Sequence, residues 1–228
     1  MRIRSVCRKD QMDIVIFGTG VHSKVVIDVV EKCGKHRIAG LLSSNLQKGE
    51  NFFGYPVLGN DKEFLMEPGP IKAGIVAIGD NWIRSKVAMN IERHIPDFHF
   101  ITAIHPFTAI GREVSIGAGT VICAGAVINP ATKIGQHCIV NTKASVDHDN
   151  HLGDFAAIMP GATTAGNVNI GRFSVVCMGA AVKHGVTIGE STVIGAGSTV
   201  LKDTTDQAVL LGSPARFHRT RRPEEPYL

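Results

Sequence analysis

The sequence predicts two architectures in one chain: a small α/β domain with a parallel sheet, followed by a parallel β-solenoid. Two observations lead to this fold class. Up to about residue 98, short apolar runs alternate with segments of helical spacing, as they do in successive βα units. From residue 104 to residue 200, an aliphatic side chain recurs at every sixth position, which is typical of stacked solenoid coils.

The first half begins with a strand–turn–helix unit over residues 13–33. Its strand is the run IVIFG, its turn is GTGVHS, and its helix is KVVIDVVEKC. The runs RIAGLL and AGIVAIG predict two further strands, and WIRSKVAMNIERH predicts a second helix. Because strands alternate with helices, we expect a small parallel sheet and place this domain at residues 13–98. Residues 1–12 are expected to form an N-terminal extension.

The second half is built on a six-residue period. Of the 17 positions from Ile104 to Val200 in steps of six, 16 carry Ile, Val or Leu, and Thr164 is the exception. Each hexad predicts a short strand and a turn, and three hexads close one triangular coil. We place the solenoid at residues 99–203. An 18-residue period of glycine marks one corner, where we expect a positive φ: Gly117, Gly135, Gly153, Gly171 and Gly189.

The end of the chain and its overall composition limit the class of protein. Residues 204–228 are expected to be a C-terminal cap and tail, with the basic run RFHRTRR solvated. The net charge of +4, without a dense basic and aromatic run, makes nucleic acid an unexpected partner. Five widely spaced cysteines without CxxC indicate a reducing cytoplasm and no metal site. No apolar run of 18 residues is present, so we expect no membrane span.

The GTG turn is the first candidate binding site. Gly18, Gly20 and the residues after them leave backbone N–H groups free at a helix N-terminus, a geometry that binds phosphate. A dinucleotide site would have an acidic residue about 20 positions later, where this chain reads LLSSN, so NAD is disfavoured. Gly79, Asp80 and Asn81 lie at the end of a predicted strand, where open α/β sheets bind ligands. The alternative is a tight turn that binds nothing.

A polar cluster interrupts the apolar rhythm in the stretch NTKASVDHDNHLGDF, residues 141–155. Acyl transfer to an amine needs a group that removes a proton, and imidazole beside a carboxylate is suited to this task near neutral pH. His148 and Asp149 supply such a pair. The alternative is a polar corner without catalytic function. His151 is expected on the surface, and Asp147 stays ambiguous.

These motifs together resemble a known family. The segments IFGTGVHSKVVIDV, GYPVLG, AIGDNWIR, NTKASVDHDNHLGDF, GATTAGNVNIG, IGAGSTVLKD and GSPAR are similar in order and spacing to the PglD-type nucleotide-aminosugar N-acetyltransferases and the related NeuD-type sialic-acid O-acetyltransferases. The resemblance implies a Rossmann-like domain followed by a left-handed parallel β-helix. It implies acetyl-CoA as co-substrate, with His148 as the general base and Asp149 as its orienting partner. It also implies a homotrimer with active sites between subunits.

The resemblance further assigns the nucleotide contacts. It implies that a nucleoside-diphosphate sugar is held by Gly20, Val21 and His22. Members of the family often have an acidic pair for the nucleobase or ribose, where this chain has Ser43 and Ser44. UDP, GDP and dTDP therefore all stay open.

For acetyl-CoA the resemblance implies backbone contacts near Gly166, Met178 and Ala196. Lys202 or Arg216 is a candidate contact for the CoA phosphates. Many members have a histidine at the acetyl carbonyl, where this chain has Ala157. Either a backbone N–H is the only hydrogen-bond donor to the oxyanion, or the acyl pocket is larger here and the acyl group differs.

The predicted function is acetyl-CoA-dependent N-acetylation of a nucleotide-linked amino sugar, in bacterial glycan or O-antigen synthesis. One alternative is O-acetylation of a sialic-acid-type sugar. Another is a non-catalytic trimer that binds a sugar nucleotide. A γ-class carbonic anhydrase is disfavoured, because the histidines lack that family's metal-ligand spacing.

Overall fold

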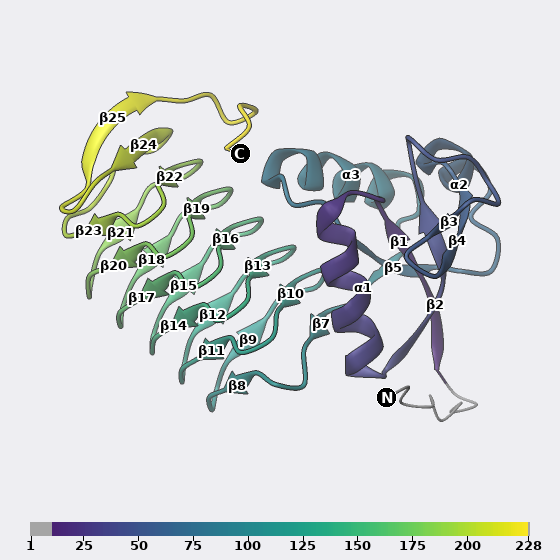
Figure 1. The fold of residues 1–228 in the computed structure, drawn as a ribbon, viewed down its shortest axis with the longest axis horizontal. Coiled ribbons are helices and arrows are strands. Elements are labelled where there is room, and N and C mark those ends of the chain that lie inside the picture. Colours follow the sequence, from purple (N-terminus) through teal and green to yellow (C-terminus); the bar gives the residue numbers. More distant parts are fainter. Residues whose placement is uncertain (1–10, 228) are drawn as a thin grey trace.

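The computed structural model describes residues 11–227 and contains two parts, an N-terminal α/β domain and a β-helix, which lie side by side (Figure 1). The N-terminal sheet has the strand order β3-β4-β2-β1-β5-β6, parallel except for the β3–β4 hairpin. Its elements are β1 (Met12–Phe17), α1 (Val21–Cys33), β2 (His36–Leu42), β3 (Asn51–Phe52), β4 (Tyr55–Gly59), α2 (Asp61–Met66), β5 (Ala73–Val76), α3 (Asn81–His94) and β6 (His99–Phe100).

Strand β1 lies inside the sheet, between β2 and β5, and its residues 14–17 are buried on both faces. Ile14 and Ile16 face the cluster that includes α1, whereas Val15 and Phe17 face the cluster that includes α3. This burial on both sides is typical of a parallel sheet between helices and explains why the run reads as continuously apolar. The predicted helices and the strands β1, β2 and β5 are present. The β3–β4 hairpin, α2 and β6 were not predicted, and β6 lies beyond the expected boundary at residue 98.

The expected N-terminal extension is only partly covered by the described residues. Residues 1–10 of that segment lie outside them. Met12 belongs to β1, one residue before the predicted start of the domain.

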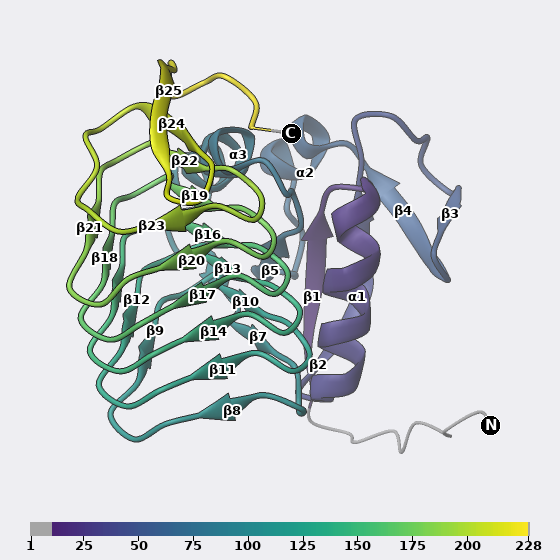
Figure 2. The ribbon, with the colours of Figure 1, turned by 60° about the vertical axis from the view of Figure 1, so that its left-hand side comes forward.

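The second part is a triangular parallel β-helix made of three sheets, named here after the first strand of each (Figure 2). The β7 sheet contains β7 (Ala103–Ile104), β10 (Val121–Ile122), β13 (Ile139–Val140), β16 (Ala157–Ile158), β19 (Val175–Val176), β22 (Val193–Ile194), β24 (Ala208–Leu211) and β25 (Arg216–Thr220). The β8 sheet contains β8 (Ala109–Ile110), β11 (Val127–Ile128), β14 (Ser145–Val146), β17 (Thr163–Thr164), β20 (Ala181–Val182) and β23 (Thr199–Val200). The β9 sheet contains β9 (Ser115–Ile116), β12 (Lys133–Ile134), β15 (His151–Leu152), β18 (Asn169–Ile170) and β21 (Thr187–Ile188).

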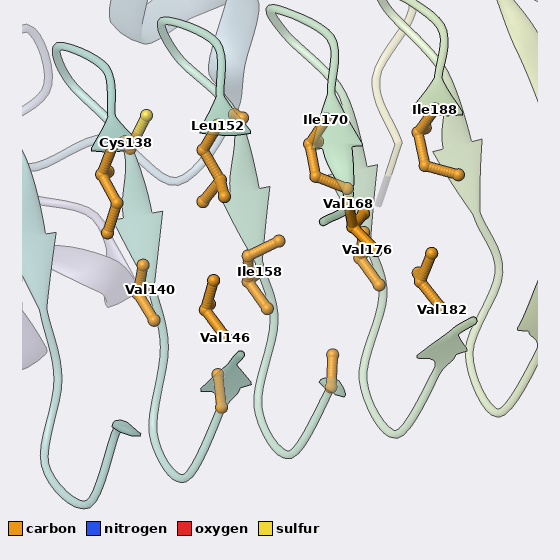
Figure 3. Close-up of a cluster of buried hydrophobic side chains, with 14 of the residues drawn as sticks. Cys138, Val140, Val146, Leu152, Ile158, Val168, Ile170, Val176, Val182 and Ile188 are labelled. Carbon is orange, nitrogen blue, oxygen red and sulfur yellow. The ribbon is translucent and has the colours of Figure 1, made fainter. Parts of the chain in front are cut away.

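The aliphatic row of the six-residue period forms the interior of this β-helix. Each strand pairs with the strand 18 residues further on, so that Ile122 lies beside Val140 and Val140 beside Ile158. Figure 3 shows part of this interior, with Val140, Ile158 and Val176 in successive coils. No single coil encloses this apolar surface, so its burial depends on the stacking of coils.

The glycines of the 18-residue period do not have the positive φ that we expected. Positive φ occurs instead three residues after the aliphatic positions, at residues such as His137 (φ 53°) and Phe155 (φ 61°). The glycine row is needed for close approach: a Cβ on Gly153 would lie 2.7 Å from the backbone nitrogen of Arg172 in the next coil. Any side chain at this row would therefore push two coils apart.

The C-terminal basic run is a strand rather than an irregular tail, and the side chains of residues 216–220 are exposed, as expected. Residues 216–220 form β25, which pairs antiparallel with β24, and β24 continues the β7 sheet. Arg221, directly after β25, is buried and donates from Nη1 to the carbonyl of Ser191 at 2.9 Å. The pairing of β25 covers the last edge of this sheet, which would otherwise present unpaired backbone groups.

Arg84 on α3 joins the two parts of the molecule. It is buried, and it donates to the carbonyls of Ile78 and Gly79 in its own domain and to those of His137 and Phe155 in the β-helix. Burial lowers its pKa to about 10, so the guanidinium remains charged at neutral pH. The α/β domain is therefore fixed to the corner between the β9 and β7 sheets. No helix among residues 11–227 has the length and apolar character needed to cross a membrane.

Candidate active site

His148 and Asp149 lie at the corner between the β8 and β9 sheets, in the turn from β14 to β15. Nδ1 of His148 is 2.7 Å from Oδ2 of Asp149. Asp149 occupies the positive-φ position of the corner (φ 56°), which carboxylate and amide side chains tolerate better than most. In the tautomer whose proton is on Nδ1, that N–H donates a hydrogen bond to the carboxylate. Nε2 then keeps its lone pair and is the basic nitrogen. The hydrogen bond to Asp149 raises the pKa of His148 above its ordinary value.

The backbone of this corner is held by the half-buried side chain of Asp147 and the buried side chain of Asn150. Oδ1 of Asp147 accepts the N–H of His148 at 2.8 Å and the side-chain N–H of Asn129 at 2.7 Å, and these bonds lower the pKa of Asp147. Asn150 is 1% exposed, and its Nδ2 lies 2.8–3.1 Å from the carbonyls of Asp147, His148 and Ala165. Asp147 thus supports the backbone beside His148.

Sequence reasoning did not identify Asn150 as a supporting residue. The signal that could have identified it is positional, because other hexads have a small residue at this point, such as Ala144 or Ala156. A buried amide at a position that normally takes alanine indicates a specific hydrogen-bonding task.

Gly166 lies directly against the imidazole of His148. A Cβ at Gly166 would be 2.5 Å from both Cε1 and Nε2 of that ring, so a larger residue would displace it. His184 lies one coil beyond Gly166, and its ring centroid is 6.4 Å from that of His148. Lys202, exposed, follows at the same 18-residue spacing. The edge that contains His148, Gly166, His184 and Lys202 is open, with the His148 side chain 49% exposed.

The other residues predicted to contact acetyl-CoA lie elsewhere on the chain. Met178 and Ala196 are exposed at the corner between the β7 and β8 sheets, across the β8 sheet from His148. Ala157 is fully buried in β16, on the outer face of the β7 sheet beside Ile139 and Val175. A single chain therefore brings Gly166 and Lys202 to the edge of His148, but not Met178, Ala196 or Ala157.

The GTG turn directly precedes α1. Gly20 is the N-cap of α1 and gives the helix no side-chain cap, and the first turn contains no acidic residue. Gly18 adopts φ 111°, and Ser23 holds the turn by donating to the carbonyls of Gly18 and Ala77. Val21 is 86% exposed at the start of the helix. The N–H groups at this helix terminus and its dipole favour an anion.

His22 faces the loop between β5 and α3. A Cβ on Gly79 would lie 3.8 Å from Cβ of His22, so the turn and the loop adjoin. Burial, with the charge of Arg84, lowers the pKa of His22 to about 4, so its imidazole is neutral at physiological pH. Its Nε2 is buried and has no hydrogen-bond partner among residues 11–227. A buried polar atom of this kind is usually paired, so Nε2 of His22 is an unsatisfied polar atom beside this turn.

Three of the predicted nucleotide contacts have side chains that are already engaged. The hydroxyl of Ser43 is buried, lies 2.6 Å from that of Thr19 and accepts two backbone N–H groups. Asp80 caps α3 by accepting the N–H of Ile83 at 2.8 Å. Asn81 is buried between Arg84 and the carbonyl of Phe173.

Ser44 is exposed, and its hydroxyl donates to Oδ1 of Asn45 at 3.2 Å. The nucleotide contacts that stay predictions here are the backbone of the GTG turn, His22, Ser44 and Gly79.

Within one chain, the candidate nucleotide contacts and the His148–Asp149 pair belong to different corners. The α/β domain packs at the corner between the β9 and β7 sheets, whereas His148 lies between the β8 and β9 sheets. Across residues 11–227, no group of three or more His, Cys, Asp and Glu side chains is arranged to hold a metal ion. The chemistry available at His148 is proton transfer by an imidazole beside a carboxylate.

Comparisons with known proteins agree with this organisation. A family model described as the PglD N-terminal domain matches residues 13–91. The chain is 30% identical over 152 residues to the GDP-perosamine N-acetyltransferase of Escherichia coli O157:H7, covering 64% of this chain and 67% of that protein. It is 33% identical over 116 residues to the UDP-N-acetylbacillosamine N-acetyltransferase of Bacillus subtilis (strain 168), covering 49% and 51% of the two chains.

A solved structure extends the similarity over nearly the whole chain. PerB from Caulobacter crescentus, in complex with CoA and GDP-perosamine, is 36% identical, with a TM-score of 0.85 over 91% of this chain and 97% of that chain. The predicted fold, a Rossmann-like domain followed by a left-handed parallel β-helix, is confirmed. The chain belongs to the PglD/NeuD-type sugar acetyltransferases of the hexapeptide-repeat acyltransferase superfamily.

Proposed function

We propose that this protein transfers the acetyl group of acetyl-CoA to the amino group of a nucleotide-linked amino sugar. The observation that carries the proposal is the His148–Asp149 pair, 2.7 Å apart, on the open edge beside Gly166. The named relatives act on GDP- and UDP-linked sugars, so the nucleotide is left to experiment. Both are N-acetyltransferases, which favours transfer to nitrogen over the O-acetylation that the NeuD-type resemblance allows.

The reaction follows from the arrangement at the corner. Nε2 of His148 accepts a proton as the amine attacks the thioester carbonyl, while Asp149 holds the Nδ1 proton and stabilises the imidazolium. The new C–N bond forms as the C–S bond breaks, and CoA leaves as the thiolate, which takes up a proton. No acyl-enzyme is required, and the buried thiols are poor nucleophiles, since burial raises the pKa of Cys123 and Cys138 to about 12.

We infer that the active unit is a homotrimer. The nucleotide candidates and His148 lie at different corners of one chain, and so do Gly166 and Met178. A cyclic arrangement of three copies would bring the edge with His148 next to another chain's surface and complete the site. Sedimentation velocity is expected to give three times the chain mass of 24.4 kDa. The thiols of Cys33, Cys123, Cys138 and Cys177 are free, which fits a reducing cytoplasm.

The test is a thiol-release assay with acetyl-CoA and a panel of acceptors. GDP-, UDP- and dTDP-linked amino sugars would be compared with free sialic acid, and the product mass determined. Release with one amino-sugar nucleotide, and addition of an acetyl group to its nitrogen, is the expected result. Release with sialic acid alone would favour O-acetylation. No release with any acceptor would support the non-catalytic alternative and contradict the proposal.

A further inference from the structure

The C-terminal segment returns from the end of the β-helix to the α/β domain (Figure 1). Arg221 anchors it, donating from Nη1 to the carbonyl of Ser191 and from Nη2 to that of Glu225. Arg219 forms an ion pair with Glu225 at 2.6 Å. These contacts hold the segment on the β-helix, so the residues that follow have a defined path.

Tyr227 ends that path beside the α/β domain. Its ring packs against the apolar outer face of the β7 sheet, near Met159 and Cys177. Its hydroxyl donates to the carbonyl of Gly79 at 2.7 Å, a bond between residues 148 positions apart. Burial raises the pKa of Tyr227 to about 12, so the hydroxyl remains a neutral donor at physiological pH.

The carbonyl of Gly79 therefore receives two hydrogen bonds. Nη1 of Arg84 donates to it at 2.8 Å from within the α/β domain, and Tyr227 donates to it from the C-terminal segment. The next residue, Asp80, caps α3, and Gly79 itself adjoins His22. The loop between β5 and α3 is thus fixed on one side by α3 and on the other by the segment from the end of the β-helix.

We propose that Tyr227 is a positioning residue for the nucleoside diphosphate. It holds the Gly79 loop in place beside His22, at the edge of the sheet where open α/β folds bind ligands. This inference rests on the proposed function, because it takes that loop to be part of the nucleotide site. Tyr227 acts through the backbone of Gly79 and does not contact the reacting atoms.

The variant that tests this is Tyr227→Phe, which removes the hydroxyl and keeps the ring. The matched control is Tyr55→Phe, since the chain contains two tyrosines and the hydroxyl of Tyr55 bonds Glu31 on α1. One lost neutral hydrogen bond corresponds to a change of about 3- to 10-fold. We expect the KM for the nucleotide sugar to rise by that factor in Tyr227→Phe, with kcat and the KM for acetyl-CoA within about twofold of the unaltered enzyme. Tyr55→Phe should change none of the three.

Two further measurements separate this inference from the proposed function. Calorimetric titration with GDP and UDP should show the same loss of affinity in Tyr227→Phe, and hydrogen exchange of residues 77–84 should become faster. Unchanged KM and affinity would overturn the inference, even if exchange became faster, and would leave the proposed function intact. If the unaltered protein releases no thiol with any acceptor, the proposed function fails. The calorimetric titrations alone then test the role of Tyr227. Weaker GDP or UDP binding by Tyr227→Phe would then support the inference, and equal or no binding would overturn it.

Discussion

His148 owes its chemistry to the residue that follows it. The carboxylate of Asp149 raises the pKa of the imidazole, and a general base acts only in its neutral form. Activity should therefore fall as the pH drops through a value above the ordinary histidine pKa of about 6.5. Asp149 can provide this hydrogen bond because the turn places it at the positive-φ position of the same corner.

Replacement of Asp149 by Asn tests this coupling. Without the carboxylate the pKa of His148 returns toward its ordinary value, so the acidic limb of the kcat profile should move to lower pH. The plateau should also fall, by about 10- to 100-fold, because a less basic imidazole in an unfixed tautomer is a poorer proton acceptor. A pH–rate profile measures both effects. A limb that stays in place would show that Asp149 does not set the pKa of the base.

At the residue scale, the sequence predicted the contact between His148 and Asp149 better than the residues that support it. His148 and Asp149 stand next to each other in the chain, so one local motif reveals them. The hydrogen bonds of Asn150 go to the carbonyls of neighbouring residues and, across the coil, to that of Ala165, 15 positions on. Likewise, the engagement of Asn81 with Arg84 and Phe173 depends on how two domains pack, which no local pattern encodes.

At the element scale, the repeat predicted the coils but not the use of its glycines. The aliphatic period is visible because every coil needs the same apolar interior. The positive-φ corners have no recognisable sequence pattern, since residues as different as His137, Phe155 and Asn167 occupy them. The glycine row has a regular period because a Cβ there would meet the backbone of the next coil.

Gly153→Ala should therefore destabilise the β-helix through crowding. The added Cβ would lie 2.7 Å from the nitrogen of Arg172 and 3.0 Å from its Cα, and overpacking of this kind costs about 1–3 kcal/mol. For a chain of this size, that cost lowers the melting midpoint by roughly 3–10 °C. Circular dichroism during heating measures it.

The matched control for that experiment is Gly161→Asn. Gly161 has φ 66° with open space around its Cα, and Asn167 adopts φ 56° at the equivalent position of the next corner. The melting midpoint of Gly161→Asn should stay within about 1–2 °C of that of the unaltered protein. Equal melting midpoints for Gly153→Ala and the unaltered protein would show that the coils can move apart without loss of stability.

At the scale of the whole molecule, one buried cation joins the two domains. Arg84 donates to four carbonyls and one side-chain oxygen, and its acceptors come from both domains. The sequence could not predict this contact, because Arg84 looks like an ordinary arginine of an amphipathic helix. The return of Tyr227 to Gly79 was equally hidden, since it requires the position of the last coil relative to the α/β domain.

Arg84→Met should uncouple the domains. It leaves the carbonyls of His137 and Phe155 without the guanidinium, and each buried group left without a partner costs about 1–3 kcal/mol. Calorimetry should then resolve a lower transition for the α/β domain and a higher one for the β-helix. Arg93→Met, at an exposed position of the same helix, should leave the melting profile unchanged. A single unchanged transition in Arg84→Met would contradict this role.

The central claim is that His148 removes the proton from an amino-sugar nucleotide during acetyl transfer. The most direct measurement is the rate of thiol release by His148→Ala, with saturating acetyl-CoA and the acceptor identified for the unaltered enzyme. We expect kcat to fall by about 10²-fold or more, the range supplied by a general base, while calorimetry shows unchanged nucleotide binding. Turnover within a few-fold of the unaltered enzyme would show that His148 is not the base and would contradict the account.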